Sequence, residues 1–121
     1  METDDADRTE ALDEVALMTL VGGDRRLAGE LAGLFLDELE PRVSQITAAV
    51  TALDADRLRD RAHALRGSAG SLRAETVSAA AGVLEAMGRS HDLDGVLQAL
   101  EELNVALASL RPRLLELAGR A

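Results

Sequence analysis

The sequence predicts an all-α protein, an antiparallel four-helix bundle with a short N-terminal capping helix. Of its 121 residues 47% are hydrophobic but only 1% aromatic, so the core must consist of small and aliphatic side chains, which favours helix packing over a sheet. These side chains recur at spacings of three and four through four long segments, the period of an amphipathic helix. The length suits one domain, assigned to residues 9–118 after a flexible acidic N-terminus at residues 1–8.

A short helix and then a long one are expected in the first part of the chain. The short helix covers residues 9–20 and ends at a Gly-Gly pair, after which Asp24 has the side chain of a helix N-cap. The long helix covers about residues 25–52, and Pro41 is expected to kink it without ending it. Its predicted apolar stripe consists of Leu27, Leu31, Leu34, Phe35, Leu39, Val43, Ile46, Val50 and Leu53.

The third predicted helix, residues 55–72, has the most regular apolar pattern. Asp54 is its predicted N-cap. Apolar residues recur alternately after four and three positions, which is typical of a helix buried along a single seam. This seam consists of Leu58, Ala62, Leu65, Ala69 and Leu72.

Two further helices complete the predicted bundle. They cover about residues 74–89 and 92–117, and a short polar turn separates them. Pro112 is expected to kink or fray the end of the last helix. Because the turns between the long helices are short, neighbouring helices must run antiparallel. The predicted buried residues are Val77, Ala81 and Leu84, and then Leu93, Val96, Leu97, Leu100, Leu103, Leu107, Leu110, Leu114 and Leu117.

Charge and missing residue types exclude several classes of function. The formal net charge of −9 argues against nucleic acid or an anionic membrane as a partner, because both attract clustered cations. All thirteen basic residues are arginine, which excludes a P-loop lysine and a Schiff base. Cysteine is absent, and the two histidines lack metal-ligand spacing, so no metal site is expected. No signal peptide or membrane span is visible, so the expected location is the cytoplasm.

One face of the third helix combines a histidine with two arginines and two glycines. At about 100° per residue, His63 points away from the seam, and Arg59, Arg66, Gly67 and Gly70 lie within about 60° of it. Each glycine costs a helix about 1 kcal/mol relative to alanine. The two glycines therefore indicate the close approach of a partner or of a neighbouring helix, and the imidazole is expected to stand on an open patch.

The helix around this histidine is basic within an acidic chain. Residues 55–73 carry five arginines and two aspartates, a net charge of +3, and the rest of the chain carries −12. One interpretation is a phosphate-binding patch, because guanidinium groups bind phosphoryl oxygens through charge-assisted hydrogen bonds. The other is an ordinary solvated helix face, and the charges alone do not decide between them.

The stretch "AHALRGSAGSLRA", residues 62–74, resembles the signature of histidine-containing phosphotransfer (HPt) domains, approximately A-H-x-L-K-G-x-x-x-x-x-G-A. The likeness extends over about residues 12–110, through "LVGGD", "LFLDELEP" and "VLEAMGR". Arg66 replaces the usual lysine and keeps its charge. Arg73 replaces the usual glycine, so it must either extend the helix or adopt an unfavourable backbone conformation. The matching residues are Ala62, His63, Leu65, Gly67 and Ala74.

This resemblance implies a phosphorelay intermediate of two-component signal transduction. His63 Nε2 would accept a phosphoryl group from the aspartyl phosphate of one receiver domain and pass it to the aspartate of another. The chain would carry the group without a cofactor of its own, and the receiver would supply Mg²⁺. Arg66 and Arg59 would stabilise the phosphorylated ring. Gly67 and Gly70 would give the receiver access to it.

The resemblance also assigns a hydrogen-bond partner to the ring. Glu85, 22 residues after His63, stands where the family often has a Glu or Gln that binds Nδ1, fixes the tautomer and leaves Nε2 free. The implied partners are receiver domains of response regulators and of hybrid histidine kinases. The alternative is a helical adaptor that binds a signalling partner through the same face without phosphorylation. His91 lies in a predicted turn and has no expected role.

Overall fold

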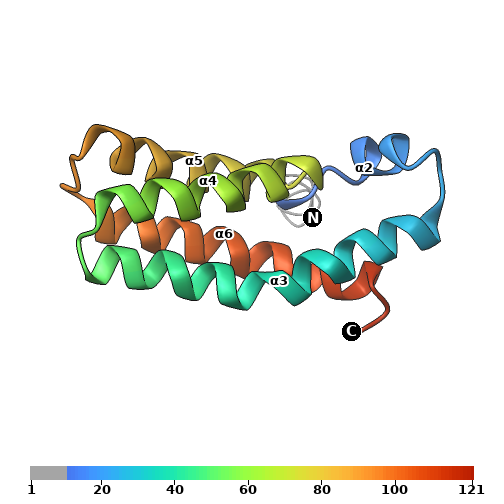
Figure 1. Ribbon diagram of the computed structural model, residues 1–121. Coiled ribbons are helices and arrows are strands. Elements are labelled where there is room, and N and C mark those ends of the chain that lie inside the picture. The colour runs from blue at the N-terminus through green and yellow to red at the C-terminus, as the bar shows by residue number, and fades with distance from the viewer. Residues whose placement is uncertain (1–10) are drawn as a thin grey trace, which may run out of the picture.

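In the computed structural model, which describes residues 11–121, the chain forms five helices joined by short turns. The long helices run alternately up and down, and each packs on two neighbours in a closed ring (Figure 1). This arrangement confirms the predicted all-α bundle. The predicted N-terminal segment, residues 1–8, and the start of the first predicted helix lie outside the described residues. The helices are α2 (Glu14–Leu20), α3 (Arg25–Thr51), α4 (Ala55–Ser71), α5 (Glu75–Ser90) and α6 (Val96–Leu117).

Aspartate side chains start three of these helices. Asp13, Asp24 and Asp54 each accept a hydrogen bond from the backbone N–H three residues on, at 2.9, 3.1 and 3.0 Å. A cap of this kind stabilises a helix by about 1 kcal/mol. The predicted caps at Asp24 and Asp54 are confirmed. The predicted helix over residues 9–20 is interrupted, because Leu12 and Asp13 are not helical and the Asp13 cap makes α2 begin at Glu14.

The last helix also begins later than predicted, at Val96 instead of residue 92. Gly95 has a left-handed φ of +81°. The side chain of Asp92 accepts a hydrogen bond from the N–H of Asp94 at 3.2 Å, which is an Asx turn. These turn preferences override the apolar residue Leu93, whose spacing alone predicts helix.

Three helices end on a residue with a side chain in the left-handed conformation, where glycine is usual. In the turn after α4, the N–H of Arg73 bonds the Gly70 carbonyl at 3.1 Å. The N–H of Ala74 bonds the Ala69 carbonyl at 2.9 Å, which completes a Schellman motif. Arg73 therefore ends α4 as a glycine would, at a backbone cost of about 1 kcal/mol. The three residues and their φ angles are Leu53 at +53°, Arg73 at +68° and His91 at +56°.

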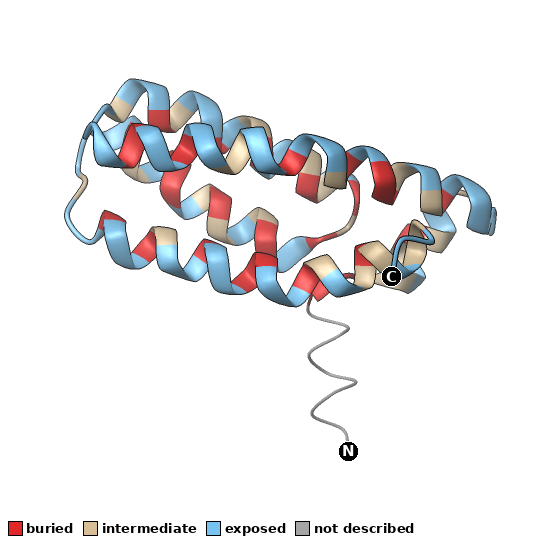
Figure 2. Cartoon of the chain, turned by 90° about the horizontal axis from the view of Figure 1, so that it is seen from below, coloured by how far each residue is buried: buried red, intermediate tan, exposed pale blue. Residues whose placement is uncertain are grey.

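The predicted seam of α4 is at the centre of the hydrophobic core. All five of its residues are buried, as are the predicted Val77, Ala81 and Leu84 of α5. Figure 2 shows buried residues along one side of each long helix, with exposed residues on the other. Full burial of a leucine side chain stabilises a fold by about 1.5–3 kcal/mol, so this inward stripe holds the bundle together.

Four leucines of the predicted apolar stripes are exposed instead. In the first half of α3 the interior positions belong to Ala28 and Ala32, which are fully buried. Leu53 lies in the left-handed turn after α3, beyond the last buried turn of that helix. The prediction assigned the interior positions to leucines at helical spacing, and for these four leucines it is wrong. The exposed leucines are Leu27 at 39%, Leu34 at 59%, Leu53 at 66% and Leu97 at 73%.

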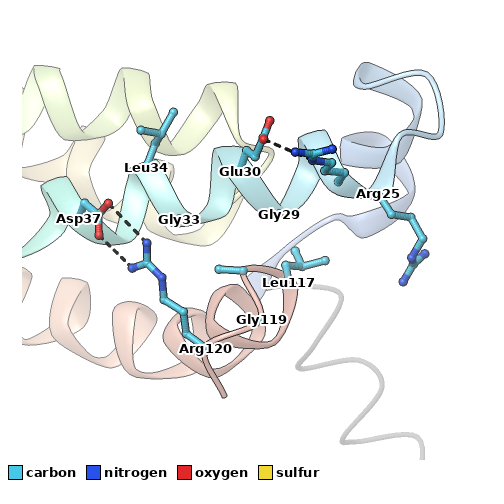
Figure 3. A pocket seen from close by; sticks show the side chains of 11 residues that line it. Arg25, Gly29, Glu30, Gly33, Leu34, Asp37, Leu117, Gly119 and Arg120 are labelled. Carbon is cyan, nitrogen blue, oxygen red and sulfur yellow. Dashed lines mark hydrogen bonds and ion pairs between the residues drawn. The ribbon is translucent and has the colours of Figure 1, made fainter.

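Small residues on α3 let the end of α6 approach closely. A Cβ on Gly29 would lie only 2.6 Å from the carbonyl oxygen of Leu117, so no side chain fits there. Nearby, Arg120 reaches across and donates to both oxygens of Asp37, at 2.9 and 3.4 Å (Figure 3). The cleft between these helix ends measures about 690 Å³, and none of its lining residues belongs to α4 or α5.

The two longest helices each contain a proline. Pro41 lies inside α3 and Pro112 inside α6, and both helices continue past the proline. A proline in this position removes one main-chain hydrogen bond, which the packed helices tolerate.

No helix between residues 11 and 121 combines the length and apolar composition needed to cross a membrane.

Candidate functional site

Helix α4 presents His63 to solvent near the middle of its length. Its neighbours Ala62 and Leu65 are fully buried, so the helical period turns the imidazole outward, as the sequence predicts. The His63 side chain is 63% exposed. A ligand or partner therefore has direct access to the ring.

Helix α5 places a buried carboxylate against this ring. Glu85 is only 2% exposed, and its Oε2 lies 2.9 Å from Nδ1 of His63. Helix α5 packs very closely on α4 at this level, because a Cβ on Gly88 would be 2.6 Å from the carbonyl oxygen of Ala55. The missing side chain of Gly88 thus brings the helix that carries Glu85 to the helix that carries His63.

Two arginines share the carboxylate of Glu85. Arg89 Nη2 donates to Oε2 at 2.6 Å, and Arg66 Nε lies 3.0 Å from Oε1. The Arg66 contact is an ion pair without the alignment of a hydrogen bond. Oε1 is buried, and it accepts no hydrogen bond within the described chain. One carboxylate between two guanidinium groups leaves the cluster with a net positive charge.

Glu85 is ionised at neutral pH despite its burial. Burial raises the pKa of this carboxyl, but the hydrogen bond with His63 and the charges of Arg66 and Arg89 outweigh that effect and lower the pKa below its ordinary value of 4.5. An ionised carboxylate only accepts hydrogen bonds. Nδ1 of His63 is therefore the donor, and the lone pair of the neutral ring is on Nε2, the nitrogen that a nucleophilic attack requires.

Arg59, the other arginine predicted to flank the ring, lies outside this cluster. Its Nε is 3.0 Å from Asp60 and its Nη1 is 3.6 Å from Asp56. The hydrogen bond with Asp60 and the charge of that carboxylate raise the pKa of Arg59. The structure therefore pairs Arg59 with acids rather than with His63. Asp56 also lies 3.1 Å from Nε2 of His91, which ends α5.

The two glycines on the histidine face have different surroundings. A Cβ on Gly67, one turn after His63, would meet nothing within 4 Å. A Cβ on Gly70 would lie 3.4 Å from the hydroxyl oxygen of Ser78 on α5. Gly67 therefore leaves open space at the surface, whereas Gly70 lies at the contact between two helices.

Two residues of the site, Arg89 and Gly82, were not predicted from the sequence. Arg89 follows Glu85 by four residues, so the helical period that places both on one face is a usable signal. Gly82 has no such signal in the sequence. A Cβ there would be 3.4 Å from Cδ of Arg66, so the aliphatic part of Arg66 crosses α5 at this glycine. That crossing depends on how two helices pack.

Comparison with known proteins identifies the class of the molecule. The family model of the Hpt domain matches residues 30–113, a range that contains His63, Arg66, Glu85 and Arg89. The chain therefore belongs to the Hpt domain family. Hpt domains are phosphocarrier modules that act in histidine phosphotransfer and interact with receiver domains or histidine kinases. No curated protein and no solved structure matches the chain.

Proposed function

We propose that this protein is a phosphorelay intermediate that carries a phosphoryl group on His63 between two receiver domains. One observation carries the proposal: an exposed imidazole whose Nδ1 is 2.9 Å from a buried, ionised carboxylate. This contact assigns the ring proton to Nδ1 and leaves the Nε2 lone pair for the reaction. A neutral ring with a free Nε2 lone pair suits a side chain that both accepts and releases a phosphoryl group.

The transfer exchanges one bond to phosphorus for another. Nε2 of His63 forms the N–P bond, the P–O bond of the aspartyl phosphate breaks, and the receiver carboxylate leaves with the electron pair. The ring keeps its proton on Nδ1 and becomes cationic, so the adjacent carboxylate of Glu85 stabilises the product. The same steps in reverse pass the group to the second receiver. We expect Mg²⁺ to come with the receiver, and this chain to use no cofactor of its own.

Arg66 is the cation best placed to bind the phosphoryl oxygens. It lies three residues after His63 on the same face of α4, and its side chain is 46% exposed. Arg59 contributes less in this proposal, because two aspartates already pair with its guanidinium group.

An open and partly apolar surface beside His63 suits a receiver domain. Gly67 adds no side chain to it, and further along α4 an apolar groove of about 430 Å³ opens between α3 and α4. Leu20 and Leu34 of this groove are 50% and 59% exposed, an apolar area that a partner would bury. We expect the receiver to cover the groove while its active site reaches Nε2. The groove is lined by Leu20, Leu31, Leu34, Phe35, Glu38, Ser68, Ser71 and Leu72.

The test is transfer from radiolabelled, phosphorylated receiver domains to the purified protein. His63→Gln removes the proposed nucleophile, and His91→Gln is the matched control because its side chain is also well exposed. Wild type and H91Q should acquire label that is acid-labile, stable to alkali and mapped to residue 63. The H63Q variant should acquire none.

The same experiment separates the relay from an adaptor. If no receiver labels the wild type, and receivers bind wild type and H63Q with equal affinity, the protein is a helical adaptor that uses this face for docking only. Label on the H63Q variant would contradict the assignment of the site.

A further inference from the structure

The three partners of the Glu85 carboxylate are bound unequally. Oε2 accepts hydrogen bonds from both Nδ1 of His63 and Nη2 of Arg89, at 2.9 and 2.6 Å. Oε1 is paired with Arg66 at 3.0 Å, without hydrogen-bond alignment. One arginine is therefore bound to the oxygen that holds the ring, and the other to an oxygen whose hydrogen-bonding capacity is unused.

We propose that Arg89 is a positioning residue that holds Oε2 of Glu85 against Nδ1 of His63 and so allows Arg66 to leave the carboxylate for the phosphoryl group. The inference rests on the proposed phosphotransfer function. It gives the two arginines different tasks, although both are paired with the same side chain in the unphosphorylated protein.

Arg66 has the features of a group that exchanges partners. Its guanidinium group is partly exposed, and its stem is supported at Gly82, where a Cβ would lie 3.4 Å from Cδ. Its contact with Oε1 is a misaligned ion pair, which is weaker than a charge-assisted hydrogen bond. A phosphoryl group on Nε2 presents three oxygens and about two negative charges. It is therefore the stronger ligand for this arginine.

Arg89 has the features of an anchor. It lies four residues after Glu85 on the same helix, so the pair stays together whatever binds to His63. Without Arg89, the carboxylate would turn toward Arg66 and engage that guanidinium group with both oxygens. Oε2 would then move away from Nδ1, and Arg66 would be held away from the phosphoryl group.

Both effects act on the same chemical step. When Nε2 attacks, the N–P bond forms, and the bond between phosphorus and the donor breaks as the donor group leaves with the electron pair. The ring becomes cationic and keeps its proton on Nδ1. The reaction then needs Oε2 at Nδ1 and Arg66 at the phosphoryl oxygens. At metal sites, loss of a residue that orients a ligating histidine typically lowers affinity or activity about 10- to 100-fold, and we expect a loss of similar size here.

The experiment compares Arg89→Met with Arg89→Lys, which keeps the charge, and with Arg61→Met as the matched control. Arg61 is an exposed arginine on α4, so R61M removes the same charge from another face. The first measurement uses ¹⁵N NMR to determine which ring nitrogen of His63 carries the proton in the isolated protein. The second is the rate of phosphorylation by phosphoramidate, whose P–N bond breaks as ammonia leaves. Because phosphoramidate has no docking surface, its rate reports the chemistry alone.

We expect wild type and R61M to hold the proton on Nδ1 and to be phosphorylated at Nε2. The R89M variant should populate both tautomers, react at least about tenfold more slowly and give a mixture of Nε2 and Nδ1 phosphohistidine. R89K should recover part of the rate. Thermal unfolding followed by circular dichroism checks that each variant is folded.

An R89M variant with the wild-type tautomer would overturn the proposal, whatever its rate, since a slower reaction would then come from lost charge alone. An R89M variant with the wild-type rate would overturn it as well. Failure of the phosphorelay function has a different result: receivers would not label the wild type, while the tautomer measurement would still decide whether Arg89 orients the ring.

Discussion

Replacing Gly67 with alanine is expected to stabilise the fold and to slow transfer from a receiver. Gly67 lies inside α4, is exposed, and a Cβ there would meet nothing within 4 Å. An exposed helical glycine costs about 0.5–1 kcal/mol relative to alanine. No lost contact offsets this gain, so the full amount should appear as added stability. For a domain of this size it corresponds to a rise in Tm of about 2–4 °C.

The functional part of this prediction follows from the same open space. The new methyl group would stand one turn from His63, on the surface that we propose the receiver covers. Transfer from a phosphorylated receiver should therefore slow, whereas phosphorylation by phosphoramidate, a small donor, should keep its wild-type rate. Thermal unfolding by circular dichroism and the two transfer assays measure both effects on the same sample.

Gly88→Ala is the contrasting variant for this experiment. A Cβ at Gly88 would be 2.6 Å from the carbonyl oxygen of Ala55, so helices α4 and α5 must separate. Overpacking of this kind costs about 1–3 kcal/mol, and it would lengthen the contact between His63 and Glu85.

A lower Tm for G67A than for wild type would refute the steric reasoning, and unchanged receiver transfer in G67A would refute the proposed docking surface.

Two further predictions concern backbone strain and acid stability. Arg73→Gly should raise the free energy of unfolding by about 1 kcal/mol, because Arg73 adopts a φ of +68° that glycine tolerates; urea unfolding measures it, and no gain would contradict the strain. The pKa of Glu85 is lowered in the folded protein. Its ionised form therefore stabilises the fold at pH values above the ordinary pKa of 4.5, and this contribution is lost as the pH falls through the folded-state pKa. The Glu85→Gln variant should lose less stability than wild type when urea unfolding is repeated at decreasing pH below that value, and an equally steep loss would show that other carboxyls govern acid unfolding.

The helices and the exposed histidine could be predicted from the sequence because they depend on local chemistry. The caps at Asp24 and Asp54, the seam of α4 and the outward direction of His63 follow from hydrogen bonding and from a period of 3.6 residues. Leucine spacing was a poorer guide in α3, where Leu27 and Leu34 are exposed. The interior there belongs to Ala28 and Ala32, and Gly29 lets the end of α6 come close.

The sequence by itself thus determined the helix faces, the caps and, through the family signature, the residues to inspect. Only the tertiary structure decided which charges of different helices meet. It brought Arg66 of α4 to the Glu85 carboxylate of α5 beside the ring, and it placed Gly88 where α5 touches α4. The physical reason is that a helical period orients side chains about one axis, whereas contacts between two helices depend on their separation, which small residues distant in the sequence set.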